Sequence, residues 1–164
     1  MSLSPTPDDA TAYRNALGAF ATGVCVVTAH TPDGPLGITV NSFTSVSLDP
    51  RLILWCLDET SERWPAFAGV DRFAVHVLPA DARALSDRFA WGVCALAEGE
   101  FDTQGEGPPR LCEALARFDC RTHDRIQMGD HLIVVGAVEA FESREGAALT
   151  YFRGRYGHVG EDPS

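Results

Sequence analysis

Short runs rich in β-branched and aromatic residues recur along the chain, and this pattern constrains the fold more than any other feature. Six runs are long enough for strands, whereas only three segments have the spacing of helices. This uneven distribution argues against alternating βαβ units and favours an antiparallel sheet closed into a small barrel. The expected strands are VCVVTAH (24–30), LGITVNS (36–42), RLILWCLD (51–58), RFAVHVLP (72–79), ALARFDCRTHDRI (114–126) and HLIVVGAVEAFES (131–143).

Three helices are expected, and the first lies near the N-terminus. Asp8 or Asp9 can cap this helix, which ends near Gly23. Its apolar face is carried by Tyr13, Leu17 and Phe20. The other two helices span residues 61–69 and 81–90.

The length and composition fit one globular domain. The chain has 164 residues, of which 45% are hydrophobic and 22% are charged. A chain of this size buries enough apolar surface to form a core of its own. We expect a flexible arm over residues 1–8, a single domain over 9–158 and a tail over 159–164.

The charge balance excludes several classes of function. The formal net charge is −10, and all 13 basic residues are arginine because the sequence contains no lysine. Schiff-base and P-loop chemistry are therefore absent. An acidic surface repels phosphate backbones and anionic lipids, so neither nucleic acid nor a membrane is an expected partner.

The cysteine pattern indicates free thiols in a reducing compartment. The five cysteines are odd in number, form no C-x-x-C pair and stand mostly among apolar neighbours. The N-terminal segment has no signal-peptide pattern, so a cytoplasmic location is expected. No histidine and cysteine spacing suits zinc, and no metal site is expected.

One uncharged polar run stands out. GITVNSFTSVSLDP (37–50) carries hydroxyl and amide groups between β-branched residues and has no charge before Asp49. Such groups can bind a flat, neutral ligand, and Gly37 lets it approach the backbone. An edge strand and turn that face water explain the same composition equally well.

Six motifs occur in the order seen in short-chain flavin reductases, and the chain resembles that family from about residue 13 to 157. The run at 37–50 is the most specific of them. The others are FATGVCVVTA (20–29), FAVHVL (73–78), LSDRFA (85–90), GDH (129–131) and YFRGRYG (151–157).

The resemblance implies a mainly β fold, a six-stranded, Greek-key-like, FMN-binding split β-barrel that forms a homodimer. It implies hydride transfer from NADH or NADPH to FMN or FAD. The reduced flavin then diffuses to a separate flavin-dependent monooxygenase. By resemblance, the isoalloxazine and ribityl groups are bound by Thr39, Val40, Asn41, Ser42, Phe43, Ser45, Val46 and Ser47.

The flavin phosphate has a candidate site after the third expected strand. Thr60 or Ser61 can cap the following helix, whose free N–H groups attract an anion, and Arg63 adds a cation. An ordinary surface cap is the alternative interpretation. By resemblance, the LSDRFA segment closes over the phosphate side through Ser86, Arg88, Phe89 and Ala90.

The nicotinamide side is assigned to two other segments. By resemblance, His131 in the GDH motif lies beside the nicotinamide and is the candidate catalytic residue, positioning it rather than relaying a proton. A turn histidine that anchors Asp130 is the structural alternative. The nicotinamide nucleotide is also assigned to Tyr151, Arg153 and Tyr156.

Two positions depart from the family's usual residues. His76 stands where asparagine is common, and its place in an expected strand favours a hydrogen-bonded core histidine. Arg153 stands where many members carry a smaller residue, and it can instead meet a phosphate of the nicotinamide dinucleotide.

Two other functions remain alternatives to the reductase. One is a protein of the same fold that binds flavin without turnover. The other is an FMN-dependent oxidase resembling pyridoxamine-phosphate oxidases, which hold a substrate phosphate with basic residues that this lysine-free chain largely lacks.

Overall fold

The computed structural model describes residues 7–102 and 105–161. Most of the expected N-terminal arm (1–6) and half of the expected tail (162–164) lie outside the described residues. The elements in chain order are α1 (Pro7–Leu17), β1 (Thr22–Gly23), β2 (Cys25–Thr31), β3 (Gly34–Val40), β4 (Thr44–Leu48), β5 (Arg51–Asp58), α2 (Trp64–Phe67), β6 (Arg72–Val77), α3 (Arg83–Trp91), β7 (Ala116–Met128), β8 (His131–Ser143), β9 (Ala148–Phe152) and β10 (Arg155–Val159).

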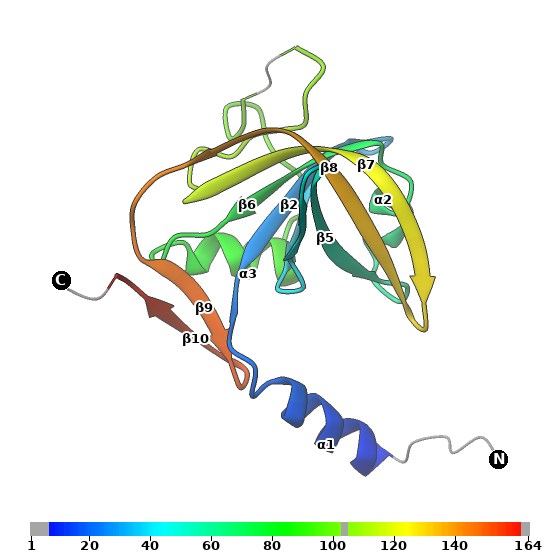
Figure 1. Cartoon of the computed structure of the whole chain (residues 1–164), viewed down its shortest axis with the longest axis vertical. Helices are drawn as coiled ribbons and strands as arrows, with labels where there is room; N and C mark the ends of the chain where they lie inside the picture. Colours follow the sequence, from blue (N-terminus) through cyan, green and yellow to red (C-terminus); the bar gives the residue numbers. More distant parts are fainter. Residues whose placement is uncertain (1–6, 103–104, 162–164) are drawn as a thin grey trace.

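Seven strands form one antiparallel sheet in the order β3-β2-β6-β7-β8-β5-β4. The sheet is strongly curved, and the long hairpin β7–β8 arches beyond the other strands (Figure 1). Among the described residues no ladder joins the edge strands β3 and β4, so the barrel is split where residues 41–43 connect them. The expected mainly β split-barrel fold is confirmed, with seven strands in the large sheet instead of six.

The remaining strands come from segments in which none was expected. The second half of the polar run forms β4, which pairs with β5. The tail forms the hairpin β9–β10, which joins β1 in a three-stranded sheet. The turn between the two strands has positive φ angles, 48° at Arg153 and 76° at Gly154. The turn divides the tail into two short strands, so the tail shows no long β-rich run in the sequence.

Alternating apolar residues of the central strands build the main core. On β5, Ile53, Trp55 and Leu57 are buried while their neighbours are only partly covered. The Trp55 ring meets Phe73 edge-on, with ring centroids 5.9 Å apart. A Cβ atom at Gly136 would lie 2.6 Å from the Phe73 ring, so the bare backbone at this position admits that ring.

A second cluster attaches α3 to the outer strand β3. Phe89 is fully buried, and a Cβ atom at Gly37 would lie 2.7 Å from its ring. The ring therefore rests on the glycine backbone, and α3 lies close against β3. Leu78 and Leu149 complete this cluster with Val26.

The first helix is shorter than expected. It ends at Leu17 rather than near Gly23, and the Gly18 N–H donates to the Arg14 carbonyl at 2.9 Å. Residues 22–23 pair with β9 instead. The apolar face that was expected to be covered stays exposed, with Tyr13 66% and Phe20 78% accessible, because α1 extends away from the sheet (Figure 1).

The five cysteines are free, as expected, but only two are buried. Burial raises the pKa of Cys25 to about 12 and raises that of Cys120 as well. Cys112 is exposed, and Cys56 and Cys94 are half-buried. Cys112 lies within the long connection between α3 and β7, at a position that is exposed on the surface.

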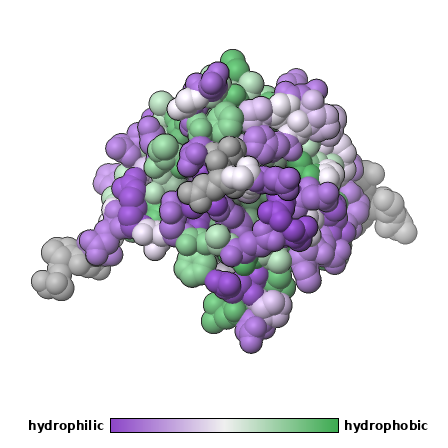
Figure 2. All heavy atoms as spheres, turned by 90° about the horizontal axis from the view of Figure 1, so that it is seen from above, coloured by the Kyte–Doolittle hydropathy of each residue, from purple (hydrophilic) through white to green (hydrophobic). Residues whose placement is uncertain are grey.

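Hydrophilic residues dominate the face seen in Figure 2, where hydrophobic residues gather in smaller groups near its margins. None of the described helices is long and apolar enough to cross a membrane.

His76 is a core residue, as its place in an expected strand indicated. It is fully buried on β6, and the Leu111 N–H donates to its Nε2 at 3.0 Å. Its Nδ1 lies 3.1 Å from the Val26 carbonyl, so the ring is neutral with its proton on Nδ1. The pKa of His76 is lowered to about 4, mainly by burial and also by the charge of Arg117, while the hydrogen bond to the Val26 carbonyl acts in the opposite direction.

This burial predicts a loss of stability in mild acid. Because the unfolded chain binds a proton at His76 below about pH 6.5 and the folded chain does not until about pH 4, stability is complete above that window and falls within it. His76→Asn should remove about 2 kcal/mol of the stability loss between pH 7.5 and pH 5. Urea unfolding of both proteins at the two pH values measures it; equal losses would contradict the assignment.

Candidate functional site

The split of the barrel is the point where the polar run is exposed. Residues 41–43 connect the two edge strands, β3 and β4. Residues 94–96 cover only the beginning of β3, because Cys94 accepts from Gly37 N and Leu96 N donates to Pro35. The outer edge at the end of β3 therefore keeps backbone polar groups available to a ligand.

A hollow of about 200 Å³ opens at the split, and we call it the split hollow. Most of its lining residues were predicted to bind the cofactor, and they come from three distant parts of the chain. β3 contributes from one side, α3 from a second and the hairpin β9–β10 from a third. The lining comprises Val24, Thr39, Val40, Asn41, Ser86, Ala90, Trp91, Tyr151 and Tyr156.

Hydrogen bonds fix the walls of the split hollow. The Thr39 hydroxyl donates to the Ser86 carbonyl at 2.7 Å, and the Ser86 hydroxyl lies 2.8 Å from the Tyr156 hydroxyl. The Tyr151 and Tyr156 rings meet edge to face, with centroids 5.3 Å apart. Burial raises the pKa of Tyr156, so this wall is neutral near pH 7.

A second hollow, of about 920 Å³, adjoins the first, and we call it the α1 hollow. The end of α1 and the turn that follows it line one side, and the β9–β10 turn lines the other. Asn41 and Tyr151 line both hollows. The full α1 lining is Arg14, Asn15, Ala16, Leu17, Gly18, Ala19, Phe20, Thr22, Asn41, Tyr151, Arg153 and Gly154.

Two polar side chains in this region suit a neutral polar ligand. Asn41 is exposed and makes no side-chain hydrogen bond among the described residues. The Thr22 hydroxyl is buried and has no partner within the described part of the chain. Amide and hydroxyl groups match the donors and acceptors of a flavin ring, so the residues present fit a flavin.

Other residues of the polar run are engaged within the protein. The Ser42 hydroxyl accepts from the Cys56 N–H at 2.8 Å, which ties the split to β5. The Phe43 ring stacks on Phe118, with centroids 5.6 Å apart. Three predicted residues on the edge strand β4 lie outside both hollows: Ser45, Val46 and Ser47.

Arg88 and Phe89 have partners within the protein. The Arg88 guanidinium binds both carboxylate oxygens of Glu100, at 2.6 and 2.9 Å. This pairing lowers the pKa of Glu100 to about 2 and raises that of Arg88. Arg88 thus holds the loop after α3, while the Phe89 ring lies in the core.

The predicted phosphate cap is wrong in its geometry. Helix α2 has only four residues and begins at Trp64, and its N-cap, Arg63, makes no side-chain capping bond. The Thr60 hydroxyl donates to Asp58, and the Ser61 hydroxyl accepts from Arg63 N. The helix is too short to offer an anion a set of aligned N–H groups.

Arg63 still reaches toward the split hollow. Its Nη2 donates to the Gly92 carbonyl at 3.4 Å, immediately after Trp91 of the split hollow. Its Nε is buried without a partner among the described residues. Arg63, the one cation of the predicted phosphate segment, therefore contacts the residue next to the split hollow.

His131 lies at the start of β8 and is partly exposed. Its Nδ1 lies 2.8 Å from the Asp130 carboxylate, which is the contact of the structural alternative. Its strand partner is Asp58. Hydrogen bonds from Thr60 lower the pKa of Asp58, and the charges of His131 and Arg14 also lower it. His131 lines neither the split hollow nor the α1 hollow.

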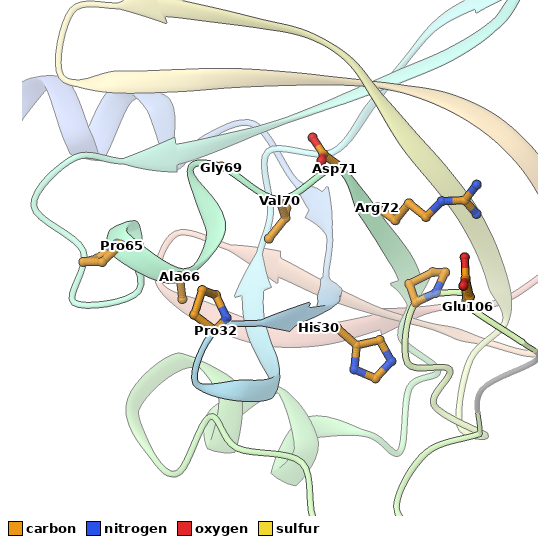
Figure 3. Close-up of a pocket in the computed structure, with 11 residues that line it drawn as sticks. His30, Pro32, Pro65, Ala66, Gly69, Val70, Asp71, Arg72 and Glu106 are labelled. Carbon is orange, nitrogen blue, oxygen red and sulfur yellow. The ribbon is translucent and has the colours of Figure 1, made fainter.

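A third hollow contains none of the predicted site residues. Figure 3 shows it between the β2–β3 turn, α2 and residues 106–108. Its volume is about 440 Å³. Its charged side chains, Asp71, Arg72 and Glu106, are of mixed sign. We call it the α2 hollow.

Sequence reasoning missed several residues that line the first two hollows. Trp91 follows the LSDRFA motif directly, so extending that motif by one residue would have found it. Arg14, Phe20 and Thr22 were missed because their role depends on where α1 ends and on the pairing of β1 with β9.

Comparisons with known proteins identify the family of the chain. The Flavin reductase like domain family matches residues 17–160. The protein "FMN reductase (NADH) SmoA" of Agrobacterium fabrum is 47% identical over 93% of this chain and 88% of its own length. The crystal structure of BorF, the flavin reductase component of a bacterial two-component tryptophan halogenase, is 34% identical, with a TM-score of 0.85 over 94% of this chain and all of BorF.

Some relatives are longer. The reductase component of the flavin-dependent trigonelline monooxygenase of Acinetobacter baylyi is 42% identical over 87% of this chain, which spans 47% of that protein. The chain belongs to the flavin reductase family, and it is an oxidoreductase that uses a flavin and a nicotinamide nucleotide.

The different environments of Asn41 and Ser42 predict opposite effects of their removal. Asn41→Ala should weaken FMN binding about tenfold, because it removes a hydrogen bond to the flavin. Stability should not change, because the exposed amide makes no side-chain hydrogen bond among the described residues. Ser42→Ala should lower the unfolding free energy by about 1–2 kcal/mol, because Cys56 N–H loses its partner.

Fluorescence titration with FMN and urea unfolding measure the two quantities in each variant. An unchanged FMN affinity for Asn41→Ala would return the polar run to a plain edge strand facing water.

Proposed function

We propose that the chain oxidises NADH, reduces FMN bound at the split and releases the reduced flavin to a separate monooxygenase. The observation that carries this proposal is the meeting of the split hollow and the α1 hollow at Asn41 and Tyr151. Two planar reactants in adjoining hollows can face each other at this boundary, as hydride transfer requires.

The residues of the chain act by binding and orientation. A bound flavin supplies the hydride acceptor, and the transfer needs no protein acid at the donor carbon. Asn41 would hydrogen-bond the flavin ring, while Tyr151 would separate it from bulk water and support the nicotinamide. The neutral pair Ser86 and Tyr156 would hold the opposite wall through its hydroxyl–hydroxyl bond.

The choice of reactants rests on the name of the Agrobacterium relative, which states FMN and NADH. His131, the predicted catalytic residue, would position the nicotinamide from the start of β8.

The acceptor of the reduced flavin is proposed from the relatives. Several are named as reductase components, among them one for trigonelline and one for 4-nitrophenol monooxygenation. The free thiols suit a reducing cytoplasm, where such a pair would work.

The proposed active form is a homodimer. β4 is an edge strand with exposed apolar residues, among them Leu48, which is 91% accessible. The hairpin β7–β8 adds two exposed residues, Met128 at its tip and Phe141 toward its open end. An unpaired apolar edge of this kind is protected when a second copy covers it.

The reactant choice is tested by initial rates with both nicotinamides and both flavins. We expect steady NADH oxidation that requires added flavin, with the highest kcat/KM for the pair NADH and FMN. Stoichiometric flavin binding without turnover would instead support the flavin-binding protein of the same fold.

His131→Ala separates positioning from anchoring. If His131 positions the nicotinamide, the variant should raise KM for NADH and slow flavin reduction in single-turnover mixing. FMN affinity and melting temperature should barely change, because the ring is partly exposed and its only hydrogen bond among the described residues is to Asp130. A lower melting temperature with normal reduction kinetics would assign His131 to the turn.

A further inference from the structure

The arginines whose side chains make neither a hydrogen bond nor an ion pair are concentrated at one end of the molecule. Nine of the 13 arginines make a side-chain hydrogen bond or an ion pair. Among the described residues, the four without either are Arg14, Arg51, Arg153 and Arg155. Three of these four lie on α1 and on the hairpin β9–β10.

The α1 hollow is positively charged in an acidic protein. Arg14 and Arg153 both line it, from opposite sides, and no aspartate or glutamate does. The chain as a whole has 23 acidic residues against 13 basic ones. The α2 hollow, by contrast, mixes Arg72 with Asp71 and Glu106, so unbalanced positive charge is a feature of this hollow.

The two guanidinium groups are held by connected backbone segments. The Arg153 N–H donates to the Gly18 carbonyl at 2.9 Å, which joins the β9–β10 turn to the end of α1. Figure 1 shows these two segments side by side. The arrangement fixes the bases of both side chains on the walls of the hollow. The Arg153 guanidinium lies over the Phe152 ring, 5.3 Å from its centroid, and no described carboxylate forms an ion pair with either guanidinium, so both can turn toward an anion.

The other lining groups match the remaining parts of a nucleotide. Phe20 is an exposed aromatic ring, and Asn15 supplies an amide. Tyr151 and Asn41 lead directly into the split hollow. With a volume of about 920 Å³, the α1 hollow has room for a ligand much larger than a single phosphate.

Resting on the proposed function, we infer that the α1 hollow binds the diphosphate of the nicotinamide dinucleotide through Arg14 and Arg153. The nicotinamide end then reaches the flavin past Tyr151 and Asn41, and the adenine end lies toward Phe20. The N-terminal helix thereby becomes a part of the substrate site, which explains why its last turn carries a cation without a partner.

Two features of the surroundings oppose an anion, and neither is decisive. Carbonyl groups end α1, but those of Arg14, Ala16, Leu17 and Gly18 already accept backbone N–H groups. Asp58 is the acidic group on which Arg14 acts electrostatically, yet it lies outside the lining and forms no ion pair with Arg14.

The test uses the full chain and ADP-ribose, which carries the diphosphate but no nicotinamide. Arg14→Gln and Arg153→Gln should each weaken ADP-ribose binding about tenfold in calorimetric titrations, because each removes a charge-assisted contact. KM for NADH should rise by a similar factor, while FMN affinity stays unchanged. Arg121→Gln is the matched control, since it removes the same charge from a residue that lines neither hollow.

The alternatives have distinct outcomes. Normal NADH turnover with ADP-ribose binding that is unchanged in both variants, or undetectable in the wild type, would overturn this inference alone. A loss confined to FAD binding would also overturn it, by assigning the diphosphate to the flavin. A wild-type chain that oxidises no NADH with either flavin would contradict the proposed function and, with it, this inference.

Discussion

The arrangement of the site depends on the packing of the Phe89 ring against the bare backbone of Gly37. Because no side chain separates them, α3 lies directly on β3 at the split of the barrel. This contact places Ser86, Ala90 and Trp91 opposite Asn41 and lets the Ser86 carbonyl accept the Thr39 hydroxyl. A larger residue at position 37 would displace the whole wall.

Several charged side chains pair with each other, whereas the proposed flavin site is lined by uncharged residues. Buried or bidentate arginine–carboxylate pairs, such as Arg88 with Glu100, hold the long loop after α3. The split hollow itself has no charged lining residue. A neutral flavin ring would meet neutral donors and acceptors there, whereas anionic groups would meet arginines at its borders.

The sequence predicted six of the seven strands of the large sheet, because each is a run of β-branched and aromatic residues, but it missed β4 in the polar run. It predicted seven of the nine residues that line the split hollow through the family resemblance. It failed where a role depends on a distant partner. The cap at Thr60 or Ser61 was expected because nothing local shows that α2 begins only at Trp64, and the sequence does not reveal that Glu100 is the ion-pair partner of Arg88. The hairpin β9–β10 was missed for a similar reason, since its pairing with β1 is not local.

A crystal structure of the chain with FMN tests the central claim most directly. The account predicts electron density for the isoalloxazine ring at the split, against Asn41 and beside Tyr151, with the phosphate toward Arg63. Density for the flavin in the α2 hollow, near Pro65 and Arg72, would contradict the account.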